Sequence, residues 1–531
     1  MLKNCRYIYS DENISTIPAH GHFGKHMLHR IKQFGDKDAI VQSETGERLT
    51  FNQLAQRMVD VALSLAKLGI RKGDVVGICS ERQTQFLPTV LGIICSGAAF
   101  APADITCGKA TILHRVNIAK PRIMFFSEQG YATHKDTLST VDTIEKFIVF
   151  SEKPHPGAIL FKDFLTETAK VEDFDTEAVD GINDTTVILY SSGTTGLPKG
   201  IPKSHHSLIV YMDSWNENKY CSRSSVLITR EWYYSYGFLQ SMYTLHDGST
   251  IVWSDKNQVE DMLTAIQNYK VKVLQLAPAT VTEIVKLPNI ERFDLSSLEY
   301  IVSASTTMQK DIVDAVTKKF SNLKMVTQFL GLSETGAVCT DLLSKVGPKP
   351  GSVGVPNAGY VLKVLDLKTR EPCGPNQRGE LCVKSPVTMK RYMGNPPYDY
   401  YDDEGFFLTG DVCYYDEDRH FFMVDRIKEL IKFNSFQVAP AELEAVLLQH
   451  PEVRDAGVVG APHAQWGQAP TAFVQLQPGA TITEDELNKY MDEQVSYRMR
   501  LAGGVKFIDS LPYGAGKKLD RKTLKQWVGI N

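Results

Sequence analysis

Residues 185–200 of the chain have the sequence TTVILYSSGTTGLPKG. The first five are β-branched or aliphatic and predict a buried strand. The rest predicts a loop that is crowded with glycines and hydroxyl side chains and that ends at Lys199 and Gly200. Glycines let backbone N–H groups turn toward an anion, hydroxyls add donors, and a lysine adds positive charge. We therefore expect a loop that binds a polyphosphate directly after a strand.

Two other interpretations fit part of this segment. It is not a Walker A loop, because the GxxxxGK[ST] spacing is absent from it. A surface loop without a ligand is the plainer interpretation of a segment rich in glycine, serine and threonine. The length of the segment and its Pro-Lys-Gly ending favour phosphate binding instead.

Strand-like and helix-like segments alternate around this loop. Residues 51–68 carry apolar residues at helical spacing. Further runs predict buried strands at 74–79, 122–126, 146–150, 186–190, 250–253 and 271–276. Strands that alternate with helices predict parallel sheets with helices on both faces. We expect an α/β fold.

The pattern changes late in the chain. Residues 379–384 and 420–424 alternate like exposed or barrel strands, and Pro440 stands where a new helix begins. We expect a large N-terminal domain of parallel-sheet layers and a small barrel over residues 1–425. A small α+β C-terminal domain would follow over residues 426–531, with the boundary at 425–430.

Composition narrows the class of protein. The formal net charge is −4, from 58 basic and 62 acidic residues, so no basic excess points to a nucleic-acid partner. The nine cysteines form no CxxC pair and predict reduced thiols. The least polar stretch, 91–103, is shorter than the roughly 18 apolar residues of a membrane span. With a polar N-terminus and no C-terminal SKL, we expect a cytoplasmic monomer without membrane insertion.

The loop is one of five motifs that resemble the adenylate-forming superfamily, which includes acyl-CoA ligases, peptide-synthetase adenylation domains and firefly luciferase. The other four follow in the family's order: Gln328–Thr335, Leu408–Asp411, Asp425–Lys428 and Gly516–Arg521. Residues 420–428 and 437–444 are similar to beetle luciferases and their insect relatives. The resemblance covers nearly the whole chain.

The resemblance implies that ATP and Mg²⁺ are bound. Glu334 would ligate Mg²⁺, a hard cation that prefers carboxylate and phosphate oxygens. Asp411 would accept hydrogen bonds from the ribose hydroxyls. The remaining nucleotide contacts would come from Ser191, Ser192, Gly193, Thr194, Thr195, Gly196, Lys199, Leu330, Ser333 and Arg426.

The resemblance also implies a mobile C-terminal domain with its pivot at Lys428. Lys517 would bring its ammonium to the α-phosphate while the acid's carboxylate attacks, which stabilises the negative charge that gathers there. No general base is needed, because a carboxylate is already ionised at neutral pH. A second closure would present Lys432 for the second half-reaction. Taken singly, Glu334, Asp411 and Lys517 also fit ordinary turn, helix-start or loop positions.

Three positions depart from the family pattern. Leu330 replaces the tyrosine that stacks on adenine, so aliphatic contact replaces aromatic stacking. Tyr234 replaces a catalytic histidine and cannot become cationic near neutral pH. Ser435 replaces a glycine in the loop of the second half-reaction, which could hinder entry of a CoA arm.

The expected acid-binding residues are also unusual. Residues 302–308 replace a glycine-rich stretch, and Tyr211 stands where beetle luciferases carry arginine. Packing in the core is the plainer interpretation of the aromatic run that contains Tyr236, and a structural role is the plainer one for His205. We nevertheless expect the small carboxylic acid to contact His205, Tyr211, Tyr236, Ser303, Ala304 and Ser305.

Three functions fit these residues. The first is an insect luciferase, which adenylates an aromatic acid and then uses O₂ to release CO₂ and light. The second is an acyl-CoA ligase, which transfers the acyl group to CoA. The third is a non-catalytic protein that keeps the ATP and acid sites.

Overall fold

The computed structural model describes residues 7–10, 20–191, 198–215, 223–256, 258–304, 308, 310–394, 400–433, 436–495, 499–514 and 518–530. Its contacts divide the chain into two compact units. The larger unit contains residues 7–362 and 383–407, and the smaller contains 363–382 and 408–531. The boundary expected at 425–430 from the sequence stays a prediction.

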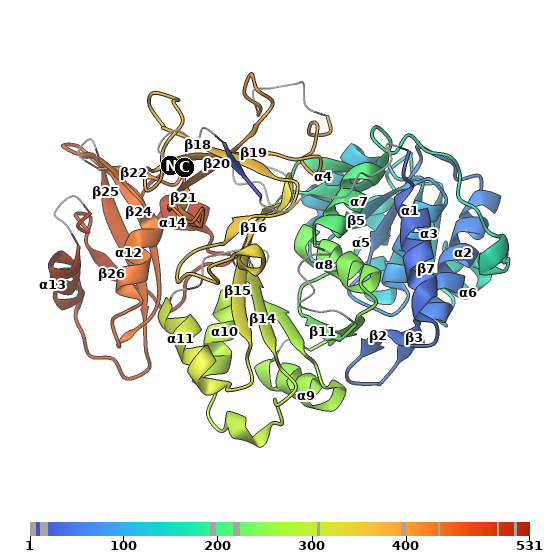
Figure 1. Ribbon diagram of the computed structural model, residues 1–531, viewed down its shortest axis with the longest axis horizontal. Coiled ribbons are helices and arrows are strands. Elements are labelled where there is room, and N and C mark those ends of the chain that lie inside the picture. The colour runs from blue at the N-terminus through green and yellow to red at the C-terminus, as the bar shows by residue number, and fades with distance from the viewer. Residues whose placement is uncertain are drawn as a thin grey trace. The chain divides into compact units, whose positions relative to one another are not determined.

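A seven-stranded sheet of the larger unit, which includes β5 and β7 in Figure 1, contains the strands on both sides of the glycine-rich segment. The strand order is β10-β9-β5-β4-β6-β7-β8, and all neighbours are parallel except β9 and β10. The strands are β4 (Val75–Cys79), β5 (Ala99–Ala103), β6 (Ile123–Ser127), β7 (Lys146–Phe150), β8 (Ile159–Leu160), β9 (Thr185–Tyr190) and β10 (Gly200–Ser204). Every residue of β5 and β6 is buried, which explains their continuous apolar sequence.

A nine-stranded sheet of the same unit has the order β17-β16-β15-β14-β13-β11-β12-β2-β3. The six strands from β15 to β2 are parallel, and antiparallel strands close both edges. The strands are β2 (Asp38–Gln42), β3 (Arg48–Thr50), β11 (Ser225–Ile228), β12 (Thr250–Trp253), β13 (Val273–Leu276), β14 (Tyr300–Ala304), β15 (Met325–Leu332), β16 (Gly336–Thr340) and β17 (Val355–Pro356).

Helices pack on these sheets as the alternating pattern predicts. The helices of the larger unit are α1 (Phe23–Ile31), α2 (Phe51–Lys67), α3 (Phe86–Cys95), α4 (Lys109–Ala119), α5 (Glu128–Leu138), α6 (Phe161–Phe164), α7 (His205–Ser214), α8 (Ser235–His246), α9 (Val259–Tyr269), α10 (Pro278–Lys286) and α11 (Lys310–Lys319). In Figure 1, α10 and α11 lie beside β14 and β15, and their apolar side chains share one core with those strands. The predicted helix over 51–68 is confirmed as α2, and the apolar run 91–103 becomes the end of the buried helix α3 and the strand β5.

A third sheet contains the strands that the sequence assigned to a small barrel. Its order is β1-β18-β19-β20-β21. The strands are β1 (Ile8–Tyr9), β18 (Val361–Leu365), β19 (Gly379–Lys384), β20 (Phe407–Tyr415) and β21 (Phe421–Arg426). The division between the two units runs through β18, β19 and β20.

The rest of the smaller unit is an α+β arrangement with its own core. A five-stranded sheet is formed by β22 (Ile431–Phe433), β23 (Phe436–Val438), β24 (Val453–His463), β25 (Gly467–Leu476) and β26 (Val505–Phe507). Its helices are α12 (Pro440–Leu447), α13 (Glu484–Gln494) and α14 (Arg521–Trp527). Pro440 occupies the first turn of α12, as predicted, and Leu443 and Leu447 are fully buried.

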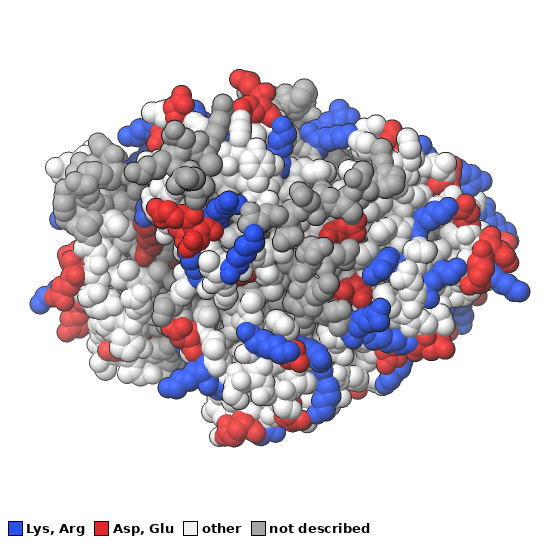
Figure 2. Space-filling model, in the orientation of Figure 1, with Lys and Arg blue, Asp and Glu red and all other residues white. Residues whose placement is uncertain are grey.

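The surface carries charges of both signs. Lysine and arginine are interspersed with aspartate and glutamate on the face that Figure 2 shows. Within the described part of the chain, no helix combines the length and the apolar character that crossing a membrane requires.

Candidate functional site

Glu334 lies in the turn that joins β15 to β16, and several contacts hold it in place. The Tyr392 hydroxyl donates a hydrogen bond to its carboxylate Oε1 at 2.7 Å. Its backbone carbonyl accepts hydrogen bonds from the Met389 N–H and the Lys203 ammonium, both at 2.8 Å. The side chain is half-buried. A carboxylate held in this way suits a hard cation such as Mg²⁺, which prefers oxygen ligands.

Lys203 is a member of this site that sequence reasoning missed. Its side chain is buried and donates to the carbonyls of Glu334 and, at 3.0 Å, Val387. Burial lowers the pKa of Lys203 to about 7. A lysine within the mostly apolar strand β10 is the signal that could have identified it, because lysine is rarely fully buried unless its ammonium has hydrogen-bond or charged partners.

Lys199 lies against two tyrosines, Tyr392 and Tyr400, and the first of these is also the partner of Glu334. Its ammonium donates a hydrogen bond to the Tyr400 hydroxyl at 3.0 Å. It also lies 4.7 Å from the ring centre of Tyr392 and 5.0 Å from that of Tyr400, which are cation–π distances. Tyr392 therefore contacts both the expected phosphate-binding cation and the expected metal ligand.

The two ends of the loop predicted to bind phosphate are held together by the β9–β10 pair. Gly200 pairs with Tyr190, and the Ser191 N–H donates to the Lys199 carbonyl at 3.1 Å. The Lys199 N–H donates in turn to the Ser191 hydroxyl at 3.3 Å. The predicted loop residues Ser192, Gly193, Thr194, Thr195 and Gly196 lie outside the described residues. The antiparallel pairing brings the first and last residues of that loop together.

Ser333 and Leu330 lie at the end of β15. The Ser235 hydroxyl donates to the Ser333 hydroxyl at 2.8 Å, which joins the start of α8 to the β15–β16 turn. Leu330 is half-buried and pairs with Cys339 across β15 and β16.

Tyr234 is held by an acidic partner. Its hydroxyl donates a hydrogen bond to Asp104 Oδ2 at 3.0 Å. Burial, together with the Asp104 charge, raises the pKa of Tyr234 well above its usual range. The hydroxyl is therefore neutral at physiological pH and acts only as a hydrogen-bonding group.

Tyr211 and Tyr236 lie in one aromatic and polar cluster, which we call the α7–α8 cluster and which also contains Trp215, Gln240, Gln275 and Phe329. The ring centres of Tyr236 and Phe329 are 5.3 Å apart, and those of Trp215 and Phe329 are 5.6 Å apart. Gln240 donates to the Tyr211 hydroxyl at 3.4 Å and accepts from Gln275 at 3.1 Å. The Tyr236 hydroxyl is buried and has no hydrogen-bond partner among the described residues. Sequence reasoning missed both glutamines, because neither falls in a family motif.

Ala304 and Ser303 point to opposite faces of β14, because successive side chains alternate across a strand. Ala304 pairs with Phe329, a member of the α7–α8 cluster. Ser303 pairs with Leu276, which belongs to the core beneath α10 and α11. The structure therefore groups Ala304, and not Ser303, with the cluster, while Ser305 lies outside the described residues.

His205 also lies apart from the α7–α8 cluster in its contacts. It is fully buried, and its Nδ1 accepts a hydrogen bond from the Phe23 N–H at 3.1 Å. Its ring lies 4.6 Å from that of His22. Burial lowers the pKa of His205 to about 3, so the ring is neutral and ties α7 to the start of α1.

Asp411 and Arg426 form a pair within the smaller unit. They face each other across β20 and β21, and Arg426 Nε lies 2.7 Å from Asp411 Oδ1. Asp411 is buried, and its N–H donates to the Thr409 hydroxyl at 3.0 Å. Gly410 adopts a positive φ of 72°, which glycine tolerates without strain. A carboxylate oriented in this way can accept hydrogen bonds from a diol.

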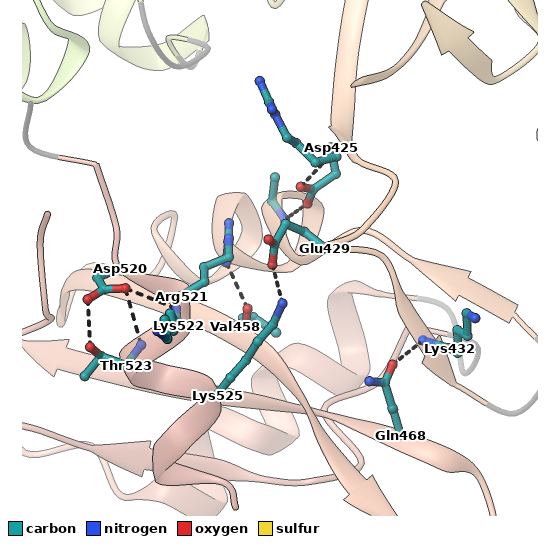
Figure 3. Close-up of polar contacts among 12 residues, drawn as sticks. Asp425, Glu429, Lys432, Val458, Gln468, Asp520, Arg521, Lys522, Thr523 and Lys525 are labelled. Carbon is teal, nitrogen blue, oxygen red and sulfur yellow. Dashed lines mark hydrogen bonds and ion pairs between the residues drawn. The ribbon is translucent and has the colours of Figure 1, made fainter. Parts of the chain in front are cut away.

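The segment 425–429 is held by further polar contacts (Figure 3). Asp425 Oδ2 accepts a hydrogen bond from the Ala441 N–H at 3.1 Å, at the start of α12. Glu429 forms an ion pair with Lys525 of α14 at 2.6 Å. Burial lowers the pKa of Lys428, the predicted pivot, from its ordinary value. These contacts tie the predicted hinge to the helices of the smaller unit.

The two predicted catalytic lysines belong to the smaller unit. Lys432 is exposed on β22, and its N–H donates to Gln468 Oε1 at 2.8 Å (Figure 3). Lys517 lies outside the described residues. The chain on either side of it is fixed, because the Gly514 N–H donates to the Lys518 carbonyl at 2.8 Å.

Comparison with known proteins adds to this geometry. The sequence profile of the AMP-binding enzyme family matches residues 27–393, and that of the AMP-binding enzyme C-terminal domain matches residues 442–518. Luciferin 4-monooxygenase of Photinus pyralis is 34% identical over 500 residues, which are 92% of this chain and 90% of that protein. 4-Coumarate–CoA ligase 1 of Petroselinum crispum is 31% identical over 521 residues, which are 96% of this chain and 94% of that protein.

A solved structure shows a similar relationship. The luciferase-like enzyme from the nonluminescent mealworm Zophobas morio superimposes with a TM-score of 0.74 at 29% identity. The superposition covers 80% of this chain and 100% of that chain.

Proposed function

The chain belongs to the AMP-binding enzyme family and is an adenylate-forming enzyme, and we propose that it is a luciferase of the insect type acting on an aromatic carboxylic acid. The observation that carries the proposal is the 34% identity to a luciferin 4-monooxygenase over 92% of the chain. The aromatic α7–α8 cluster supports it.

The nucleotide-binding roles rest on the geometry above. Lys199 is proposed to bind the outer phosphates of ATP, where its charge offsets theirs. Glu334, oriented by Tyr392, is proposed to hold Mg²⁺, which neutralises phosphate charge during the transfer. Asp411, oriented by Arg426, is proposed to bind the ribose hydroxyls.

The first half-reaction is proposed to be an attack by a carboxylate oxygen of the acid on the α-phosphorus of ATP. The bond to pyrophosphate breaks as the acyl–phosphate bond forms. Negative charge gathers around phosphorus, and the Lys517 ammonium is proposed to stabilise it. In the luciferase reaction the adjacent carbon of the adenylate then loses a proton and reacts with O₂, and AMP leaves. One oxygen atom of O₂ departs in CO₂, the other stays on that carbon as a carbonyl, and the carbonyl product emits light.

The α7–α8 cluster supports an aromatic acid with polar substituents. Tyr236, Phe329 and Trp215 make T-shaped ring contacts with one another, and such an aromatic environment suits a planar aromatic substrate. The buried Tyr236 hydroxyl lacks a partner among the described residues, and a buried hydroxyl is costly to leave without a hydrogen bond. A polar group on the acid would satisfy it.

An acyl-CoA ligase is the second candidate. The 4-coumarate–CoA ligase relative is nearly as similar, at 31% identity over 96% of the chain, and its reaction shares the first half. In that case Lys432 would serve transfer of the acyl group to CoA. The structural neighbour from a nonluminescent insect shows that a luciferase-like protein need not come from a light-emitting animal.

The experiment is a two-stage assay of purified full-length protein. Pyrophosphate release is first measured with ATP, Mg²⁺ and a panel of aromatic and aliphatic acids. Acids that release pyrophosphate are then incubated with O₂ and a photon counter, or with CoA and thioester detection by mass spectrometry.

Light that depends on ATP and O₂ is the expected result. Thioester formation without light for every active acid would overturn the luciferase proposal and leave the ligase. Absence of pyrophosphate release with all acids, from protein that still binds ATP, would indicate the non-catalytic alternative.

A further inference from the structure

Three helices of the larger unit bring a second set of ligand-type side chains together. His26 lies on α1, Asp213 on α7 and His246 at the end of α8, and these three helices contact one another (Figure 1). One ligand atom from each side chain lies within 4.8 Å of the other two. None of these residues belongs to a motif used above.

The two imidazole rings are unusually close. Their Nε2 atoms are 2.8 Å apart, and the rings are nearly parallel at 4.9 Å between centres. Without an ion, one ring must donate its N–H to the other. His246 is 1% exposed, and its Nδ1 is buried without a hydrogen-bond partner among the described residues. The two Nε2 atoms face one point, as two imidazole ligands of a single ion do.

The surroundings allow a cation to enter and to be neutralised. His26 and Asp213 are half-buried, so the cluster is reached from the surface, and Asp213 brings a negative charge. Arg30 is the opposing cation nearby, and its guanidinium donates to the His246 carbonyl at 3.2 Å and to Gln33 at 3.2 Å.

The donor set selects the class of ion. Imidazole nitrogens with one carboxylate suit zinc, cobalt and nickel, whereas Mg²⁺ prefers oxygen ligands alone. Nitrogen–zinc bonds of about 2.05 Å in a tetrahedral site place two nitrogens about 3.3 Å apart. The rings therefore need to separate by about half an ångström, a shift that side-chain torsions can supply.

We propose that His26, Asp213 and His246 bind one divalent cation of the zinc class, at a site distinct from the magnesium site proposed at Glu334. The bound ion joins α1, α7 and α8 and stabilises the folded larger unit. The proposal does not depend on the proposed function, because neither ATP nor an acid takes part.

The test measures metal binding directly. The full chain is stripped with a chelator and titrated with Co²⁺, whose visible absorption reports nitrogen ligation, and then with Zn²⁺ in equilibrium dialysis. We expect one equivalent to bind and to raise the melting temperature. Loss of a residue that only hydrogen-bonds to a metal ligand typically weakens metal affinity about 10- to 100-fold. Removal of a ligand itself should weaken the affinity by at least that factor.

Matched variants separate this site from other metal-binding groups. His26→Gln and His246→Gln, which keep a hydrogen-bonding side chain, should lose the bound equivalent and its absorption. Asp213→Asn should weaken binding, and Arg30→Gln should tighten it because a repelling cation is removed. His29→Ala, on the exposed face of the same helix, should bind like the wild type.

Either of two results would overturn the proposal. The first is no bound equivalent in the wild type at micromolar metal. The second is equal binding in the wild type and in folded His26→Gln and His246→Gln proteins, with folding checked by circular dichroism.

Discussion

At the residue scale, Tyr392 contacts the charged side chains of both Glu334 and Lys199. Its hydroxyl fixes the Glu334 carboxylate, and its ring lies beside the Lys199 ammonium. A hydrogen bond to a charged group contributes about 1.5–3 kcal/mol. The hydrogen bond from Tyr392 is therefore strong enough to fix the orientation of the Glu334 carboxylate toward a metal ion.

Tyr392→Phe tests that role. We expect the Mg²⁺ concentration for half-maximal pyrophosphate release to rise about tenfold, since a loss of about 1.4 kcal/mol corresponds to that factor. Tyr400→Phe is the matched control, because its hydroxyl contacts Lys199 instead of Glu334. An unchanged Mg²⁺ requirement in Tyr392→Phe would remove the tyrosine from this role.

Tyr236→Phe separates substrate contact from stability. Removing a buried hydroxyl that has no partner among the described residues should leave the melting temperature unchanged or slightly raised. If the hydroxyl binds the acid, KM for the preferred acid should rise about tenfold while KM for ATP stays constant. Steady-state pyrophosphate assays measure both constants, and an unchanged KM for the acid would contradict a substrate contact.

Asp341 predicts a pH dependence of stability. Burial raises the pKa of Asp341 from 3.8 to about 7. The folded state therefore holds a proton that the unfolded state releases between pH 4 and 7. The resulting stabilisation is complete below pH 4 and is lost as the pH rises through 7.

Asp341→Asn should remove this dependence, because an amide stays neutral at every pH. We expect the variant to be about 4 kcal/mol more stable than the wild type at pH 8, since each unit of pKa corresponds to about 1.4 kcal/mol, and the difference to shrink toward pH 4. Thermal unfolding at pH 4, 6 and 8 measures it. A difference that does not vary with pH would contradict the linkage.

At the element scale, helix starts are set by short-range chemistry. Helix α2 begins with a capping box in which the Thr50 hydroxyl accepts from the Gln53 N–H and the Gln53 side chain accepts from the Thr50 N–H. Helix α13 of the smaller unit begins in the same way with Thr483 and Glu486. Each box satisfies two donors that a helix start otherwise leaves open.

Thr50→Ala should destabilise the larger unit by about 1 kcal/mol, the usual cost of losing such a cap. Thr50→Ser keeps the oxygen and should cost clearly less. Chemical unfolding followed by circular dichroism measures both. Equal losses in the two variants would show that the threonine methyl group, and not the cap, matters there.

The strand predictions illustrate why elements could be recognised before the structure. The run 186–190 is confirmed within β9, and 146–150 matches β7. Strands buried on both faces need apolar residues throughout, so their sequences stand out. The site is harder to foresee, because Lys203 and Gln275 bond to Glu334 and Gln240, which lie far away along the chain on other elements.

At the scale of the whole molecule, the proposed reaction needs residues from both units. Lys199 and Glu334 lie in the larger unit, whereas Asp411, Lys432 and Lys517 lie in the smaller. Movement of the smaller unit about residues 425–430 remains a prediction from the family resemblance.

Lys517→Ala and Lys432→Ala test this division of labour. We expect Lys517→Ala to slow pyrophosphate release at least a hundredfold while the affinity for ATP changes little. Lys432→Ala should leave pyrophosphate release near wild type and slow only the step that follows. Rapid-quench assays resolve the two steps, and the opposite pattern would contradict the proposed closures.

The sequence by itself determined the family and the alternating α/β layers, and it supplied the motifs from which nucleotide binding is predicted. These depend on local pattern, that is, on apolar periodicity and on glycines beside hydroxyls and charges. The tertiary structure alone decided which distant side chains meet: Tyr392 with Glu334, Gln240 with Gln275, and His26 with His246. Such pairs depend on how sheets and helices pack, and that packing cannot be inferred from the residues that are adjacent in the sequence.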